Sequence, residues 1–94
     1  MNLATLRRMK PQILAIAAEH GVGNVRVFGS VARGEADEAS DVDFLVTIEE
    51  LKGWKYFGLG SALEDLLGCE VDIGSDDALH PRLRERILLE AVPL

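Results

Sequence analysis

The sequence predicts a single α+β domain in which a small mixed β-sheet and its packed helices form two layers. Three runs of β-prone apolar residues, at 25–28, 41–48 and 69–73, are bounded by glycine or polar residues. Stretches with helical spacing of apolar residues precede, separate and follow these runs. The 94 residues are enough for one hydrophobic core, and no linker or repeat divides them. We therefore assign residues 1–94 to one domain.

Composition limits the classes of function that fit. Hydrophobic residues make up 48% of the chain and charged residues 28%, which is a normal globular balance. The net charge of −6 makes direct binding to a nucleic acid backbone unexpected. The one cysteine, Cys69, allows no internal disulfide and is expected to be a small buried hydrophobe. No apolar run reaches the ~20 residues of a membrane span, and no signal peptide is recognisable, so we expect a cytoplasmic protein.

The N-terminal stretch is predicted to be helical from Asn2 to His20, with an interruption at Pro11. Asn2 is a suitable N-cap for the first helical turn. Proline cannot donate a helical hydrogen bond, so we expect a break or kink at this point. A second helix is expected to begin at Pro11 and to end at Gly21.

A tight turn follows the first predicted strand, Val25–Phe28. Gly29 lets the backbone turn sharply and approach a ligand closely. Ser30 is predicted to be the N-cap of the short helical segment that follows, and the N–H groups of a helix start favour an anion such as a phosphate. Arg33 is either an ordinary surface residue or a support for the turn or a phosphate.

Two aspartates lie two positions apart at the start of the second predicted strand, Asp41–Ile48. Side chains alternate along a strand, so Asp41 and Asp43 share a face, with Cα atoms roughly 6.5–7 Å apart. This spacing lets the two carboxylates converge on one hard cation or bridge a pair of cations. A strand end that emerges into water is the alternative, although aspartate is depleted in strands. Ser40 could orient Asp41 or could be a plain turn residue.

A helix is predicted from Trp54 to Leu67, with a shorter helix capped by Ser61 as the alternative. The third strand is predicted at Cys69–Ile73. If it lies beside the second strand, Asp72 can complete a cluster of three carboxylates, and Glu70 is the competing candidate.

The C-terminal region is predicted to be a loop over 74–80 followed by a helix over 81–91. The loop aspartates are expected to cap the following turn. His80 is expected to be an ordinary loop residue, with nucleotide binding as the alternative. In the helix, Leu83, Ile87 and Leu88 are expected to face inward, with the arginines mostly outward.

The compound motif resembles the signature of the polymerase-β-like nucleotidyltransferases. It consists of Gly29-Ser30, Ala32-Arg33-Gly34 and Ser40-Asp41-x-Asp43, with strands on both sides. A Gly-Ser pair or an Asp-x-Asp pair alone is a weak signal, whereas the combination is specific. The length of the chain and the order of its elements are most similar to the minimal members of this superfamily.

The resemblance implies the polymerase-β-like nucleotidyltransferase fold and Mg²⁺-dependent transfer of a nucleotidyl group from ATP by a two-metal mechanism. It places the third carboxylate on a strand after the middle helix, between apolar residues, which favours Asp72 over Glu70. The implied site residues are Asp41, Asp43 and Asp72 for catalysis and metal binding, and Gly29, Ser30 and Arg33 for nucleotide binding.

The resemblance also implies a biological role. Minimal nucleotidyltransferases of this type act as antitoxins that transfer AMP to a tyrosine of a HEPN ribonuclease toxin. The predicted single domain contains no separate acceptor-binding unit, and its acidic charge suits a basic partner. The alternatives are a nucleotidyltransferase acting on a small molecule such as an aminoglycoside, and an antitoxin acting by binding alone. Neither direct nucleic acid binding nor membrane association is expected.

Overall fold

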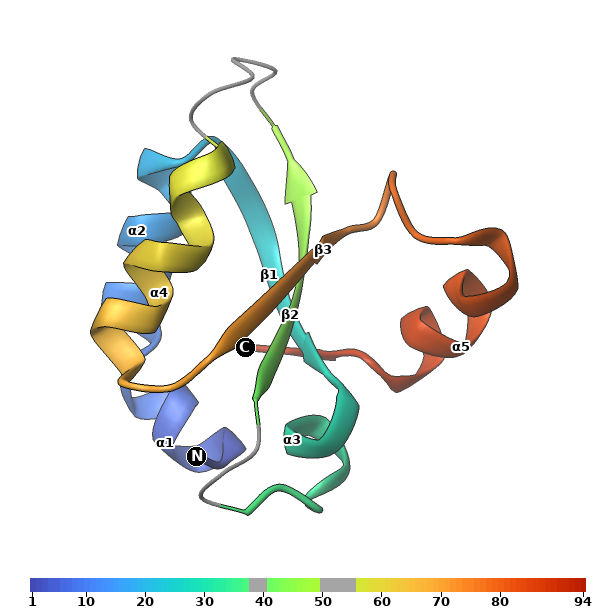
Figure 1. Ribbon diagram of the computed structural model, residues 1–94, viewed down its shortest axis with the longest axis horizontal. Helices are drawn as coiled ribbons and strands as arrows, with labels where there is room; N and C mark the ends of the chain where they lie inside the picture. Colours follow the sequence, from blue (N-terminus) through green and yellow to red (C-terminus); the bar gives the residue numbers. More distant parts are fainter. Residues whose placement is uncertain (38–40, 50–55) are drawn as a thin grey trace.

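A computed structural model describes residues 1–37, 41–49 and 56–94, and its centre is a four-stranded sheet (Figure 1). The strands are β1 Val22–Phe28, β2 Val42–Ile48, β3 Val71–Ser75 and β4 Val92–Pro93, in the spatial order β3-β2-β1-β4. β1 runs antiparallel to both β2 and β4, whereas β2 and β3 are parallel. The predicted mixed sheet is confirmed, and the two-residue β4 is an addition that the sequence did not indicate.

The helices divide between the two faces of this sheet. α1 (Leu3–Arg8), α2 (Lys10–Glu19) and α4 (Leu59–Leu67) gather on one side, and α5 (Pro81–Glu90) stands on the other (Figure 1). The short α3 (Gly29–Arg33) follows β1, and a 3₁₀ turn at Tyr56–Gly58 leads into α4. The predicted α+β class is therefore confirmed. No helix in the described part of the chain is long and apolar enough to cross a membrane.

The core lies between the sheet and the α2–α4 layer. Alternation along β2 turns Val42, Phe44 and Val46 toward these helices, where all three are buried. Asp43, Leu45 and Thr47 occupy the opposite face, as predicted, and we call this the open face of the sheet. The core is completed by apolar side chains of the other elements, namely Leu6, Ile13, Ala17, Val22, Val25, Val27, Val31, Leu59, Leu63 and Leu94.

The predicted interruption of the N-terminal helix is confirmed. α1 ends at Arg8, and α2 begins at Lys10 with Pro11 in its first turn. A proline is tolerated there because the first N–H groups of a helix have no helical acceptor. The predicted cap at Asn2 is also present, since its Oδ1 accepts a hydrogen bond from the Thr5 N–H at 2.8 Å.

Two strand boundaries differ from the prediction. β1 begins at Val22 and not at Val25, because Val22 is buried in the core and pairs with Ile48. An irregularity between Gly23 and Arg26 interrupts the pairing, and Asn24 there has a positive φ of 48°. β3 spans Val71–Ser75 and not Cys69–Ile73, because the parallel register with β2 continues to Ser75.

Two predicted helix caps are wrong. α3 begins at Gly29, and Phe28 takes the N-cap position, so Ser30 lies inside the helix and not at its cap. α4 begins at Leu59, two residues before Ser61, which excludes the shorter helix. The predicted end of the helix at Leu67 is confirmed, and its C-cap, Gly68, has the left-handed conformation. The expectations for Ser40 and for the helix start at Trp54 lie outside the described residues.

The bounds of α5 agree with the prediction to within one residue, but the direction of its side chains does not. Leu83 is 49% exposed and Leu88 is 39% exposed, and no residue of α5 is buried. Both leucines were expected to face inward, as was Ile87, which is half-buried. The reason is that α5 lies outside the α2–α4 layer and meets the open face, where polar side chains predominate. Its position therefore depends on polar contacts, which are described below.

Candidate functional site

Asp43 and Asp72 come together on the open face. They are register partners on the parallel strands β2 and β3, and their carboxyl groups lie close enough for Asp72 to raise the pKa of Asp43. Glu70, the competing candidate, lies before β3 and is exposed, and its carbonyl accepts a hydrogen bond from the Val42 N–H. The structure thus places Asp72, and not Glu70, beside Asp43.

Burial raises the pKa of Asp43, and the negative charges of Asp72 and Asp41 raise it further. The positive charge of Arg33 acts in the opposite direction. Because these like charges repel each other, the Asp43–Asp72 pair is suited to hold a cation between its oxygens.

Asp41 is exposed and lies immediately before β2, close enough for its charge to affect Asp43. Within residues 1–37, 41–49 and 56–94, no three histidine, cysteine, aspartate or glutamate side chains are gathered closely enough, as they stand, to hold a metal ion. The donors themselves are of the kind that Mg²⁺ prefers, because all three are carboxylate oxygens. In donor chemistry the residues fit Mg²⁺, with two of the three carboxylates already in contact.

Gly29 brings the backbone directly against Asp43. Its φ is +73°, a conformation that favours glycine, and it follows Phe28, the register partner of Asp43 on β1. A Cβ atom built on Gly29 would lie 2.2 Å from Asp43 Oδ2, far inside van der Waals contact. The predicted sharp turn is present, and it brings the backbone close to the Asp43 carboxylate. Ser30 follows in the first turn of α3.

Arg33, on the last turn of α3, is held by two glutamates. Its Nε donates to Glu35 Oε2 at 2.9 Å, and its Nη1 donates to Glu90 Oε1 of α5. These contacts raise the pKa of the Arg33 guanidinium, with Glu90 the larger cause. Of the interpretations given for Arg33, support of the turn is the one that matches these contacts. Sequence analysis missed Glu90, because nothing in a helical pattern indicates contact with residues 57 positions away.

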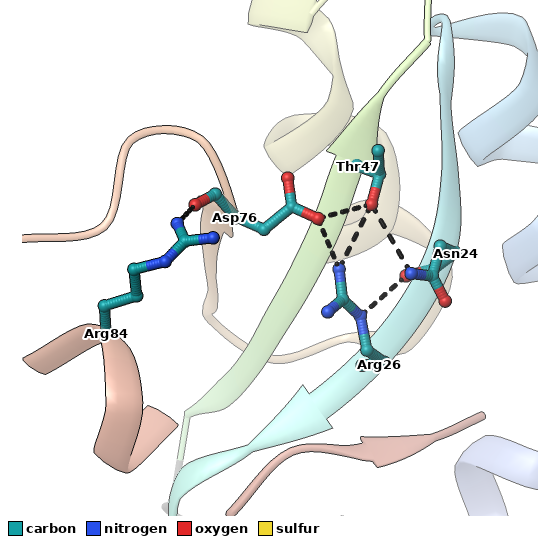
Figure 2. A network of polar contacts seen from close by, with 5 residues as sticks. All are labelled: Asn24, Arg26, Thr47, Asp76 and Arg84. Carbon is teal, nitrogen blue, oxygen red and sulfur yellow. Dashed lines mark hydrogen bonds and ion pairs between the residues drawn. The ribbon is translucent and has the colours of Figure 1, made fainter. Parts of the chain in front are cut away.

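A polar network occupies the open face toward the other end of β2 (Figure 2). Asp76 Oδ2 accepts hydrogen bonds from Thr47 Oγ1 at 2.6 Å and from Arg26 Nη2 at 3.1 Å. Arg26 Nε also donates to the Asn24 carbonyl at 3.0 Å, and Arg84 of α5 donates to the Asp76 carbonyl. The bond from Thr47, followed by that from Arg26, lowers the pKa of Asp76. The predicted capping role is therefore wrong for Asp76, which instead joins β1, β2 and α5.

The alternation of side chains along a strand could have predicted two of these residues on the open face. Arg26 lies two residues before Phe28, the register partner of Asp43, and Thr47 lies four residues after Asp43. Their partner Asp76 was not predictable, since it lies beyond β3 in a loop. His80 caps α5, where its Nδ1 accepts a hydrogen bond from the Arg82 N–H at 3.2 Å. This contact gives His80 a structural role.

Comparison with known proteins identifies the family. Residues 10–94 match the family described as nucleotidyltransferase domain. Protein adenylyltransferase MntA of Thermococcus cleftensis is 44% identical, over 98% of both chains. The Methanocaldococcus jannaschii protein MJ0435, provisionally assigned as a protein adenylyltransferase, is 42% identical over 98% of this chain and 97% of its own.

Solved structures show the same fold. A structure described provisionally as a minimal nucleotidyltransferase superposes with a TM-score of 0.85 at 54% identity, covering 100% of this chain and 97% of the other. A toxin–antitoxin crystal structure with AMP-PNP superposes with a TM-score of 0.75 at 18% identity, covering 89% and 70%. The second likeness concerns the fold alone. The resemblance to minimal nucleotidyltransferases is confirmed, and the chain belongs to the nucleotidyltransferase domain family.

Proposed function

We propose that this protein is an antitoxin that transfers AMP from ATP to a tyrosine hydroxyl of a HEPN-type ribonuclease toxin and thereby silences it. The observation that carries the proposal is the Asp43–Asp72 carboxylate pair on adjacent strands, with the Gly29 turn pressed against Asp43. The near full-length similarity to a protein adenylyltransferase supports a protein as the acceptor.

In the proposed reaction the acceptor oxygen attacks the α-phosphorus of ATP. The bond between the α-phosphorus and the bridging oxygen to the β-phosphorus breaks, and pyrophosphate leaves. Asp72 is the proposed acceptor of the proton of the acceptor hydroxyl, and its exposure on the edge strand β3 supports this role. Gly29 and Ser30 present backbone N–H groups to the β- and γ-phosphates, and Arg33 holds this turn in place.

The carboxylates provide the ligands for metal ions. Asp41, Asp43 and Asp72 would hold two Mg²⁺ ions, which stabilise the attacking and leaving oxygens of an in-line displacement when bound. Asp43 is the central ligand of this set, because both of the other carboxylates raise its pKa. A raised pKa makes protons stronger competitors for this carboxylate, so metal affinity should increase with pH.

The acceptor is proposed to come from a partner protein. A toxin–antitoxin complex shares the fold, although at 18% identity the likeness does not extend to the partner. The net charge of −6 is complementary to a basic RNA-cutting enzyme.

A transfer assay with intact-mass detection tests the proposal. Purified protein, Mg·ATP and the product of the neighbouring gene are mixed, and the masses of both proteins are measured. A mass gain of one or more AMP units on the partner, located on a tyrosine by peptide mapping and absent with Asp43→Asn, is the expected result.

Other outcomes would contradict the proposal in distinguishable ways. An unmodified partner that the Asp43→Asn protein still inhibits fully would indicate neutralisation by binding alone. AMP transfer to an aminoglycoside in the absence of any protein acceptor would indicate a small-molecule nucleotidyltransferase.

A further inference from the structure

Glu90, the last residue of α5, reaches the turn between β1 and α3. Its Oε1 accepts a hydrogen bond from Arg33 Nη1. The Gly29 backbone N–H lies near the same carboxylate and contributes, after the larger effect of Arg33, to lowering the pKa of Glu90. The Glu90 side chain is only 19% exposed, whereas Glu35, the other partner of Arg33, is 65% exposed. Glu90 is thus the sheltered contact of Arg33.

The backbone on either side of Glu90 is fixed to the same part of the sheet. Immediately after it, the Ala91 N–H closes α5 on the Ile87 carbonyl at 2.8 Å, and Val92 pairs with Val27. The Leu94 side chain is buried in the core. β4 therefore anchors the end of α5 to β1, the strand that leads directly into Gly29.

This anchoring gives Glu90 a defined position relative to the site. Gly29 is in turn pressed against Asp43, so the contacts form a continuous path from α5 to the central carboxylate. The ion pair of the Glu90 carboxylate is with Arg33, which neutralises its charge. Its chemistry is therefore that of a support for the turn and not of a further metal ligand.

We infer that Glu90 is a positioning residue of the nucleotide site, which holds Gly29 and Arg33 in the arrangement that receives the triphosphate. The inference rests on the proposed function. In the absence of Glu90, Arg33 keeps only the exposed Glu35, and the contact that joins α5 to α3 at this turn is lost. The turn then has to be ordered by the nucleotide itself, so the loss appears in nucleotide binding and less in the chemical step.

Calorimetry with Mg·ATP and steady-state AMP transfer test this prediction. Glu90→Ala should raise both the Kd and the KM for Mg·ATP about 10-fold, with kcat changed by less than about 3-fold. Glu90→Gln keeps an oxygen that can accept from Arg33 Nη1, so its Kd should stay within about 3-fold of wild type. Glu85→Ala, an exposed glutamate on the same helix, is the matched control and should behave as wild type.

A second measurement needs no nucleotide. The Gly29 amide proton should shift in the NMR spectrum of Glu90→Ala and keep its position in Glu85→Ala, because only the first variant removes a carboxylate that lies near this N–H. An unmoved Gly29 resonance would overturn the inference. Unchanged or tighter Mg·ATP binding by Glu90→Ala would also overturn it, and tighter binding would mean that Glu90 competes with the phosphates.

The two proposals fail separately. Wild-type protein that does not bind Mg·ATP would refute the proposed function. The positioning role of Glu90 depends on that function and would be refuted as well, even if the Gly29 resonance responds to Glu90→Ala. Wild-type binding and transfer that Glu90→Ala leaves intact would refute the positioning role alone.

Discussion

The two faces of the sheet are held together by different kinds of interaction. On the face covered by α2 and α4, apolar side chains such as Ile13, Leu59 and Leu63 are buried against the strands. On the open face, no residue of α5 is buried, and the helix is held through Arg84 near its start and Glu90 at its end. Figure 1 shows the result, a compact layer on one side and a helix standing apart on the other.

The difference separates stability from function. Burial of apolar area is the main favourable term in folding, so the α2–α4 side provides most of the stability. The open face instead gathers mutually repelling carboxylates and a positive-φ turn, features that cost stability and are characteristic of ligand sites. Removal of a site carboxylate should therefore cost activity without loss of stability, whereas removal of a core side chain should cost stability.

The largest effect is expected from Asp43→Asn. AMP transfer should fall on the order of 10³-fold or more, because the central ligand of the proposed metal site is lost. The melting temperature of the metal-free protein should rise by a few degrees. Folding raises the pKa of Asp43, so its ionisation above the ordinary aspartate pKa costs stability, and asparagine removes that cost.

Asp65→Asn, at an exposed position on α4, is the control for removal of a negative charge far from the pair. Calorimetry and thermal unfolding measure both parts of the prediction. Unchanged Mg·ATP affinity in Asp43→Asn would contradict the assignment of the site. A lower melting temperature of metal-free Asp43→Asn than of wild type would contradict the conclusion that the carboxylates of the open face cost stability.

The second effect concerns the packed face. Leu63→Ala should destabilise the protein by about 2–5 kcal/mol, since Leu63 is 2% exposed and its removal leaves a cavity. Leu89→Ala on α5 should change stability by less than about 0.5 kcal/mol, because Leu89 is 82% exposed. Urea unfolding of the two variants compares the faces directly. Similar losses in both would show that α5 is packed in solution more closely than the structure describes.

The third effect combines stability and binding at Gly29. Gly29→Val should cost about 2–4 kcal/mol, because a β-branched residue is placed at positive φ with its Cβ against Asp43. It should also abolish Mg·ATP binding, whereas Ser30→Ala should be mild because the backbone amides remain. Denaturant unfolding and calorimetry measure the two parts. Wild-type ATP affinity in a folded Gly29→Val protein would show that the turn is only a structural link.

Local patterns were sufficient to predict much of this molecule. The alternation of β2 placed Asp43 and the core valines on their correct faces, and the adjacency of β2 and β3 brought Asp72 beside Asp43. The spacing of apolar residues predicts which side chains of a helix or strand can be buried. This prediction was correct for β2, whose apolar side chains pack against several neighbouring elements, and for α4, whose Leu59 and Leu63 lie in the core.

The same reasoning was wrong for α5, because periodicity does not say whether an apolar surface is available to receive the leucines. The remaining misses depend on contacts between residues far apart in the chain. Glu90 contacts Arg33 across 57 positions, and Asp76 contacts Arg26 across 50. Polar pairs of this kind have no local signal, since a glutamate or an aspartate on a surface can serve many partners.

The smallest effect is expected from Asp76→Asn, which removes the ionic contact of the open face. Asp76 accepts from Thr47 and Arg26 and its side chain is 20% exposed, so we expect a loss of about 1–2 kcal/mol after allowance for solvent screening. The sign with pH follows from the lowered pKa of Asp76. The carboxylate contributes stability at pH values above the ordinary aspartate pKa of about 3.9, and this contribution is lost as pH falls through the lower folded pKa.

Urea unfolding at neutral pH and in acid should therefore show a difference between wild type and Asp76→Asn that narrows in acid. Asp77→Asn, at the exposed neighbouring position, should differ little from wild type at either pH. A constant difference for Asp76→Asn across this range would mean that the carboxylate acts through shape alone, and the open face would then be held, like the packed face, by interactions that do not depend on charge.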